Sequence, residues 1–237
     1  MAETEDVHWW FAGRRAIASA MIEGLNLPSQ AAIFEIGAGT GGNLSMLMRY
    51  GQVRAVEPDG FARAWAIRKT GVQVLNGHLP DGLPFSSERF DLVCLFDVLE
   101  HVEEDRASLR AIRQLLKPNG KVLLTVPAYR WLWSTHDNKH HHVRRYSRAG
   151  LIKLARATGY RLVKITFFNT FLLPVVIAAR VFDRLIRKPD SSGTQIPPRF
   201  VNGLLKGVLS LEAALIVRST LPLGVSLLTI LEPNDVV

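Results

Sequence analysis

Apolar runs alternate with amphipathic stretches along the first two thirds of the chain. Runs such as "AAIFEI" and "FDLVCLF" lack the strict apolar–polar alternation of half-exposed strands, which is typical of strands buried on both faces. The predicted strands cover residues 31–36, 53–57, 72–75, 90–96, 121–127, 161–168 and 225–233. Helical patterns separate the earlier strands near residues 42–50, 60–69 and 103–116, and "KPNG" ends the last of these. This alternation predicts an α/β fold with a doubly wound, mainly parallel sheet.

The pattern changes between the last two predicted strands. Residues 170–224 are rich in Leu, Val and Ala, with arginines and the loop "KPDSSGTQIPPR" between helical stretches. We interpret them as a helical insert in a main domain formed by residues 1–169 and 225–237. The stretch "FFNTFLLPVVIAARVFDRLIRK" carries more apolar surface than a solvated helix, with basic residues on its polar side. It is typical of an interfacial helix, a lid over an amphiphilic substrate or a homodimer surface, and packing onto the core is the plain alternative.

Composition narrows the class of protein. A chain of 237 residues with 48% hydrophobic content can build a full-sized core without disulfides or metals. Its single cysteine, Cys94, lies in an apolar run, so we expect a buried, reduced thiol. The start "MAETEDVHWW" contains no apolar signal region, so we expect a cytoplasmic protein. We also expect no helix that spans a membrane, because no long uncharged apolar run occurs.

Charge is distributed unevenly. Residues 1–125 hold 13 Lys and Arg against 15 Asp and Glu, whereas residues 126–237 hold 16 against 6. This asymmetry favours an anionic partner for the second half, either nucleic acid or membrane headgroups, with simple solubility as the alternative.

A glycine-rich turn follows the first predicted strand, in "FEIGAGTGG". Its glycines fit G-x-G-x-x-G, and Glu57 lies 20 residues after Gly37 at the end of the next strand, as in dinucleotide-binding proteins. The same letters fit E-x-G-x-G-x-G, led by Glu35. The turn alone therefore leaves two cofactors open.

Later segments resemble one family. "LPFSSERFDLVCLFDVLEHV" and "LRAIRQLLKPNGKVLLTVP" are similar to motifs of the class I S-adenosylmethionine-dependent methyltransferases, in particular the small-molecule branch that includes the ubiquinone-biosynthesis enzymes. The resemblance covers roughly residues 30–165. It implies a Rossmann-like fold with a seven-stranded sheet and an N-terminal helical lid, with S-adenosyl-L-methionine as cofactor and S-adenosyl-L-homocysteine as product. No "NPPY"-type base-flipping motif follows the fourth strand, so we expect no nucleic-acid partner.

The resemblance also implies a set of cofactor-binding residues. Glu57 would accept the ribose hydroxyls, and Glu35 would orient the turn or meet the ligand's ammonium group. Where relatives often place an acid near adenine, this chain has His78, so its backbone and that of Leu79 would serve instead. The full set is Arg14, Glu35, Gly37, Ala38, Gly39, Gly41, Glu57, Pro58, His78, Leu79, Asp97 and Val98.

"DVLEHV" ends the fourth strand with Asp97, Glu100 and His101. In a helical segment, Asp97 and His101 would share one face at i, i+4. His101 is a candidate general base because the imidazole pKa lies near neutrality. Two alternatives are a divalent cation on these three side chains, with Mg²⁺ favoured by the oxygen ligands, and a structural hydrogen-bonding role.

"WSTHDNKHHHVRRYS" should hang over the ligand cleft, because it follows the fifth main strand. His136 and His142 are further candidate catalytic residues. Apart from Asp137, no cysteine or well-spaced acid completes a tetrahedral site with the histidines of this stretch, so the sequence predicts no metal ion here. Arg144 and Arg145 would bind an anionic group, with Tyr146 as a wall. The alternative is a solvated basic loop before a helix capped by Ser147.

"HWWFAGRRAIASAMI" predicts a helix that begins with aromatic residues. As a lid, it would place Trp10 against the substrate and Arg14 or Arg15 on the donor carboxylate. The alternative is a helix that only covers the sheet.

These features together predict an enzyme that transfers a methyl group by in-line displacement. The acceptor is a lipid-linked or anionic small molecule, with oxygen as the expected acceptor atom. Further expected partners are an anionic membrane surface, where the protein would be peripheral, and a second copy. A non-catalytic S-adenosylmethionine-binding protein and an NAD-dependent reductase are the alternatives.

Overall fold

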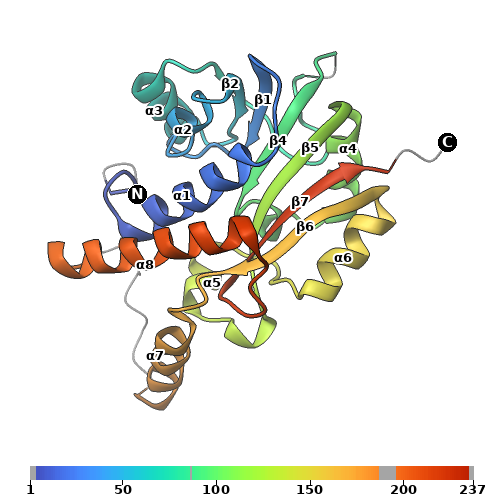
Figure 1. The fold of residues 1–237 in the computed structure, drawn as a ribbon. Helices are drawn as coiled ribbons and strands as arrows, with labels where there is room; N and C mark the ends of the chain where they lie inside the picture. Colours follow the sequence, from blue (N-terminus) through green and yellow to red (C-terminus); the bar gives the residue numbers. More distant parts are fainter. Residues whose placement is uncertain (1–3, 86, 187–195, 235–237) are drawn as a thin grey trace.

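In the computed structural model, residues 4–85, 87–186 and 196–234 are described. Seven strands form one sheet (Figure 1). They are β1 (Ala31–Ile36), β2 (Gly51–Val56), β3 (Val74–Leu75), β4 (Phe90–Phe96), β5 (Leu116–Pro127), β6 (Tyr160–Phe168) and β7 (Ser226–Pro233). Their order is β3-β2-β1-β4-β5-β7-β6, and β7 runs antiparallel to both neighbours. The predicted seven-stranded, mainly parallel sheet is confirmed.

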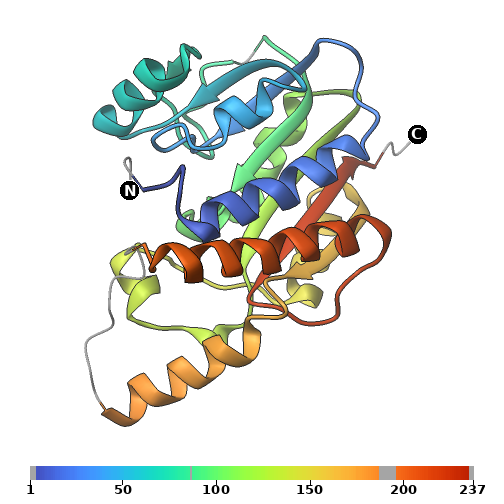
Figure 2. The same ribbon diagram turned by 60° about the vertical axis from the view of Figure 1, so that its left-hand side comes forward.

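Helices cover both faces of this sheet. They are α1 (Trp9–Glu23), α2 (Leu44–Leu47), α3 (Gly60–Thr70), α4 (Asp105–Gln114), α5 (Thr135–Lys139), α6 (Arg148–Ala157), α7 (Leu173–Ile186) and α8 (Arg199–Arg218), with short 3₁₀ turns η1 (Leu99–His101) and η2 (Arg130–Leu132). α1 and α8 lie side by side on one face, and α4 and α6 cover the other (Figures 1 and 2). Ser147 caps α6 as predicted, because its side chain accepts from the Gly150 N–H.

Alternate residues of each strand feed two apolar cores. In β4, Val93 and Leu95 pack with α4 and α6, whereas Leu92 and Cys94 pack with α1 and α8. Each of these four side chains is fully buried. Both faces of a parallel sheet must be covered in this way, which explains the near-continuous apolar strands.

The helices α7 and α8 lie between β6 and β7, where the insert was expected. The inner face of α8 buries Leu209 and Ile216 in the same core as α1, so this helix is continuous with the main domain. At the crossing, a Cβ on Gly13 of α1 would lie 2.3 Å from Leu209 Cδ1. Only glycine permits this close approach of the two helices. Most of the predicted loop at residues 188–199 lies outside the described residues.

The bounds of one predicted strand need correction. The helix α4 ends at Gln114, just before "KPNG", but β5 begins at Leu116 instead of residue 121, and Leu116 pairs with Phe90 through an irregular register. The expectation that no helix spans a membrane stays a prediction, although α8 is 20 residues long and its apolar window has a mean hydropathy of 1.7. Within the described residues it is the one helix long and apolar enough to cross a membrane, and only 22% of its apolar window is buried.

We expect Gly13→Ala to lower the free energy of unfolding by about 1–3 kcal/mol, because the added methyl overpacks the contact with Leu209. Gly203→Ala is the matched control on the outer side of α8, where a Cβ would meet no atom within 4 Å. That change should stabilise the protein by up to about 1 kcal/mol, because alanine is the better helix former. Denaturant unfolding measures both. Equal effects of the two substitutions would contradict the close α1–α8 contact.

Candidate active site

The glycine turn after β1 combines a tight contact with an open side. Gly37 has φ +75°, and a Cβ there would lie 2.6 Å from Val98 Cγ2, so the turn packs against the residue just beyond β4. Gly39 has φ +54°, and a Cβ there would meet no atom within 4 Å. Its backbone therefore faces free space at the carboxyl edge of the sheet, where ligands of doubly wound folds bind.

Glu57 holds this turn from the neighbouring strand. Its Oε2 accepts a hydrogen bond from the Gly39 N–H at 2.8 Å, and its Oε1 accepts from the Asp59 N–H at 3.0 Å. The side chain is largely buried, and each carboxylate oxygen keeps a further lone pair. The geometry suits the predicted contact with a pair of ribose hydroxyls, which needs two acceptor oxygens beside the turn.

Glu35 lies beneath the turn and is fully buried. Its Oε1 accepts from Asn43 Nδ2 at 2.8 Å, whereas its Oε2 has no partner among the described residues. Burial raises the pKa of Glu35 to about 8, although the hydrogen bond from Asn43 opposes this shift. An unpaired oxygen at this place suits a ligand cation such as the ammonium of the methyl donor.

The remaining predicted cofactor residues follow the ends of adjacent strands. The N–H groups of Gly37 and Ala38 both donate to the Val56 carbonyl, which ties the turn to β2. Past β3, the backbone of His78 bridges to Gly82, with the His78 ring exposed and Leu79 buried. Gly41 completes the turn, and Pro58 follows Glu57 on the exposed side.

Arg14 and Asp97 form an ion pair at the carboxyl edge of the sheet beside the glycine turn, which we call the donor edge. Thr125 Oγ1 also donates to Asp97 Oδ1 at 3.0 Å. Arg14 is thus bound to a protein carboxylate in this structure, where the sequence suggested a contact with the donor carboxylate. Asp97 has a φ of +58° and lies outside any helix. The element that follows it is the short 3₁₀ turn η1, which begins at Leu99. The expectation that Asp97 and His101 share a helical face is therefore wrong.

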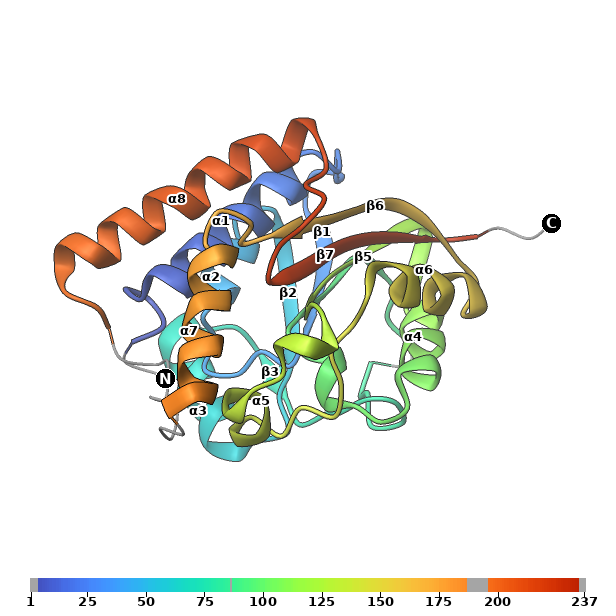
Figure 3. The ribbon, with the colours of Figure 1, turned by 90° about the horizontal axis from the view of Figure 1, so that it is seen from below.

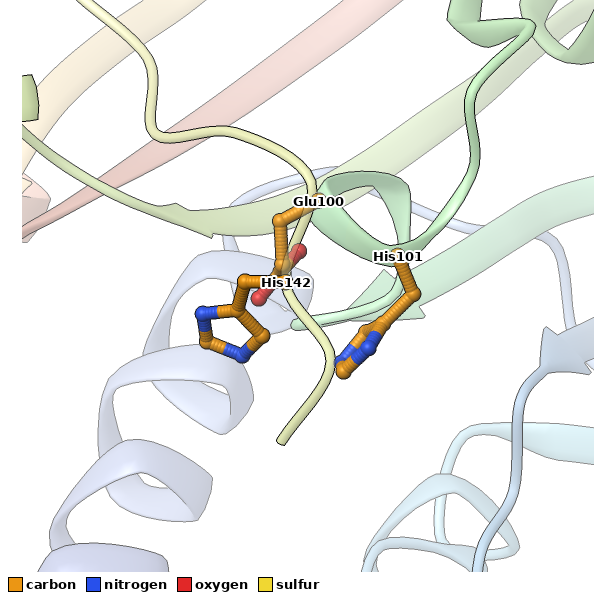
Figure 4. Close-up of side chains that lie close together, drawn as sticks. All are labelled: Glu100, His101 and His142. Carbon is orange, nitrogen blue, oxygen red and sulfur yellow. The ribbon is translucent and has the colours of Figure 1, made fainter. Parts of the chain in front are cut away.

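The stretch after β5 folds back onto η1 and brings histidines together. The Val143 N–H donates to the Glu100 carbonyl at 2.8 Å, which pins the loop beside this turn. The rings of His101 and His142 meet edge to face, with centroids 4.7 Å apart. Glu100 lies next to them (Figure 4) and is fully buried, and within the described part of the chain neither of its carboxylate oxygens has a hydrogen-bond partner.

His136 and His140 extend this cluster from α5. Their ring centroids are 4.3 Å apart, and the His136 ring lies 6.3 Å from that of His142. Burial and the neighbouring imidazoles lower the pKa of His136 to about 4, and the same causes lower the pKa of His101. The imidazoles of His101 and His136 are therefore neutral at pH 7 and can accept a proton or bind a cation.

A buried carboxylate organises this loop. Asp137 Oδ1 accepts from His142 Nδ1 at 2.9 Å, and both of its oxygens accept from Arg145, at 2.7 and 3.0 Å. Burial opposes ionisation of Asp137, but the hydrogen bonds from His142 and Arg145 hold the pKa of this carboxyl well below its usual range. Asp137 was missed as a functional residue, although the "HD…HVRR" spacing was visible.

The three residues that were predicted to bind substrate from this loop make internal contacts. Arg144 Nη1 donates to Asp105 Oδ2 at 2.7 Å, and the Tyr146 hydroxyl donates to the same oxygen at 3.2 Å. Tyr146 is buried, and burial beside Asp105 raises the pKa of its hydroxyl. With Arg145 bound to Asp137, these side chains build the loop. Their geometry favours a supporting role over the anion binding and substrate wall suggested by the sequence.

The aromatic start of α1 also makes internal contacts. Trp10 stacks on Phe168 at the end of β6, with ring centroids 5.9 Å apart and planes 18° from parallel. The Trp9 N–H donates to Asn202 Oδ1 at 2.9 Å, so α8 caps the first turn of α1. Trp10 thus lies half-buried between α1 and the sheet. The first turn of α1 therefore packs against β6 and α8, and Arg14 in the next turn reaches the donor edge.

A nucleotide-binding turn, an acid at the end of β2 and a sheet with a reversed seventh strand define an S-adenosylmethionine-dependent enzyme. Comparison with known proteins supports this class. A family model described as a methyltransferase domain matches residues 12–165. The chain belongs to this methyltransferase family, and its cofactor is S-adenosyl-L-methionine. No curated protein matches the sequence.

Solved structures share the fold at low sequence identity. A chain in the complex of the Haloferax volcanii Trm112 methyltransferase activator with a methyltransferase has a TM-score of 0.63 and 19% identity, over 98% of this chain and 91% of that one. A TehB-like methyltransferase from Corynebacterium glutamicum has a TM-score of 0.54 and 16% identity, over 91% and 86%. The glycopeptide N-methyltransferase MtfA, solved with S-adenosylmethionine, has a TM-score of 0.51 and 14% identity, over 65% and 86%.

The raised pKa of Glu35 makes stability depend on pH. Folding holds a proton on Glu35 that the unfolded chain releases above its ordinary pKa of 4.5, so stability falls as pH rises from 4.5 to about 8. Glu35→Gln cannot titrate, so its stability relative to the unmodified protein should grow across this interval, by about 1.4 kcal/mol per pKa unit at most. Urea unfolding at pH 5, 7 and 9 measures the difference. A difference that is constant with pH would contradict the assignment.

Proposed function

We propose that this enzyme transfers a methyl group from S-adenosylmethionine to a hydroxyl of an amphiphilic small molecule. The observation that carries the proposal is the cluster of His101, His136 and His142 near the donor turn, in which the pKa values of His101 and His136 are lowered. Val98 packs on Gly37, and His101 follows it by only three residues. A hydroxyl acceptor must lose a proton, whereas an amine or an enol carbon is already nucleophilic. The cluster therefore favours oxygen as the acceptor atom.

The transfer depends mainly on alignment of the acceptor oxygen with the S–CH₃ bond, because the methyl carbon already carries a good leaving group. The acceptor oxygen attacks the methyl carbon, the S–CH₃ bond breaks as the O–CH₃ bond forms, and S-adenosylhomocysteine leaves. The hydroxyl proton passes to an imidazole of the cluster formed by His101, His136 and His142. Holding donor and acceptor in line can supply about 7–11 kcal/mol of the barrier. The sulfonium charge disappears during transfer, so a closed, dry site favours the reaction further.

The residues around the turn supply the donor contacts. Glu57 accepts the ribose hydroxyls, and the glycine backbone approaches the amino-acid end above the buried Glu35. Arg14 exchanges Asp97 for the donor carboxylate, or remains on Asp97 and orders the edge of the site. The similarity of "DVLEHV" to ubiquinone-biosynthesis methyltransferases supports a polyprenyl-linked acceptor. A non-catalytic S-adenosylmethionine-binding protein is the competing interpretation.

Purified protein should transfer labelled methyl groups from S-adenosylmethionine to hydroxyl acceptors with apolar tails, and less to amines of similar size. Glu57→Gln should lose at least about tenfold in S-adenosylhomocysteine affinity by calorimetry, because one charged acceptor for the ribose is removed. Asp59→Asn is the control, because asparagine also caps α3. Thermal unfolding of both variants checks that the turn remains folded.

Unchanged ligand affinity in folded Glu57→Gln would contradict the ribose contact. Tight ligand binding without transfer to any acceptor class would favour the non-catalytic alternative.

We also propose that the protein is cytoplasmic and docks on an anionic membrane surface through α8. The outer face of this helix exposes an apolar row at four- and seven-residue spacing, and Phe200 is 82% exposed. The row is formed by Phe200, Leu204, Leu211 and Leu215. The only acid of the helix, Glu212, is buried and accepts from the Phe171 N–H, so its exposed charges are all cationic. This combination is typical of interfacial helices.

Liposome flotation tests the membrane proposal. The protein should float with phosphatidylglycerol vesicles and much less with phosphatidylcholine vesicles, because the cationic residues need anionic headgroups. The triple variant Phe200→Ser, Leu204→Ser, Leu211→Ser should stay in the soluble fraction. Phe61→Ser, which removes an exposed aromatic residue from α3, should float normally. Failure to float, with a dimer mass in light scattering that the triple variant loses, would assign the face to a second copy.

A further inference from the structure

Glu100, His101 and His142 converge although they come from two separate segments. Glu100 and His101 lie on η1 at the end of β4, and His142 lies in the loop after α5 (Figure 4). One possible ligand atom from each of these side chains lies within 4.8 Å of the others. Bound to one Zn²⁺ ion, each of the three atoms would lie roughly 2.0–2.2 Å from the metal, so the three side chains would have to move closer together. Figure 3 shows α5 and α7 near this end of the sheet.

The carboxylate of Glu100 lacks the partners that a buried charge needs. It is fully buried, and both oxygens are without a hydrogen bond among the described residues. An unpaired buried carboxylate is costly, so such groups are normally paired, protonated or bound to a metal ion. The two neighbouring imidazoles are not charged partners when neutral. A cation between the three side chains would satisfy Glu100.

The surroundings of His142 orient it as a ligand. Its Nδ1 donates to Asp137, which in turn accepts two hydrogen bonds from Arg145. A proton fixed on Nδ1 leaves Nε2 with a free lone pair. This carboxylate–histidine arrangement is typical of the outer shell of metal sites, where it fixes the ring and its tautomer.

The structure also removes Asp97 from the ligand set. Its two oxygens are held by Arg14 and Thr125, so the set that the sequence offered on one turn does not form. His142, distant in sequence, stands in its place. The ligands change from three mainly oxygen donors to two imidazoles and one carboxylate. That set suits Zn²⁺ better than Mg²⁺, which prefers oxygen and water.

We propose that Glu100, His101 and His142 bind one Zn²⁺ ion, although the sequence predicted no metal. Two histidines and one glutamate leave a fourth position open, as in catalytic zinc sites. The binding claim stands by itself. The role of the ion rests on the proposed function, because an acceptor hydroxyl in the open position would lose its proton more readily. His136 lies outside the ligand set, so it is the member of the cluster left to accept the proton.

The test uses untagged full-length protein that has been stripped with a chelator and dialysed. Calorimetric titration with Zn²⁺ should give one ion per chain, and Co²⁺ as a probe should give the visible absorption of a site with nitrogen ligands. Glu100→Gln and His101→Asn should each weaken Zn²⁺ binding by at least tenfold. Asp137→Asn should weaken it about 10- to 100-fold through His142. His141→Asn, on an exposed neighbour outside the set, should bind normally.

Stability provides a second measurement that does not depend on activity. Zn²⁺ should raise the melting temperature of the unmodified protein and not that of Glu100→Gln. Without metal, Glu100→Gln should melt no lower than the unmodified protein, because the substitution removes an unpaired buried acid. Absence of Zn²⁺ binding, or equal binding in Glu100→Gln, His101→Asn and the unmodified protein, would overturn the proposal. S-adenosylhomocysteine titration of the same stripped protein shows separately whether the proposed function survives.

Discussion

The donor site depends on the hydrogen bond between the Glu57 carboxylate and the Gly39 N–H. β1 and β2 are parallel neighbours with Ile36 opposite Val56, so both strands end at the same edge. The acid that follows one strand can therefore reach the turn that follows the other. This contact fixes a backbone conformation that only glycines adopt easily, and the free side of the turn then faces the ligand. Removing the acid would loosen the turn and remove a ligand contact together.

Costly features gather at this same edge. Among the residues that the structure describes, Glu35 and Glu100 are buried with unpaired oxygens, and Asp97 and Tyr129 have positive φ values just beyond β4 and β5. Residues in such states destabilise a fold unless the surroundings hold them, and they concentrate where ligands bind. The ion pair of Arg14 with Asp97 and the pair of Arg145 with Asp137 supply that support. A bound methyl donor and a bound cation would each satisfy one of the unpaired acids.

The helix α8 links the core, the entry to the site and the exterior. Its inner face is buried against α1, and Asn202 hydrogen-bonds the backbone at both Val7 and Trp9. The first turn of α1 thus depends on α8, and the next turn carries Arg14 to the donor edge. Docking of the outer face of α8 on a bilayer would hold this assembly next to amphiphilic acceptors. The surface proposal and the methyl-transfer proposal are therefore physically connected.

The sequence alone determined the strands, the glycine turn and the place of Glu57, because each depends on neighbours within a few residues or on one strand–turn–helix unit. It did not determine which charged groups pair. The ion pairs of Arg14 with Asp97 and of Arg144 with Asp105 join segments tens of residues apart, so their distances exist only after the sheet has aligned the strand ends. Burial is likewise a tertiary property: Tyr146, which the sequence suggested as a wall of the substrate site, is buried and hydrogen-bonded to Asp105. The tertiary structure decided the chemistry of the histidine cluster. The pKa values of His101 and His136 are lowered by burial and by neighbouring imidazoles, and both causes require side chains that meet in space.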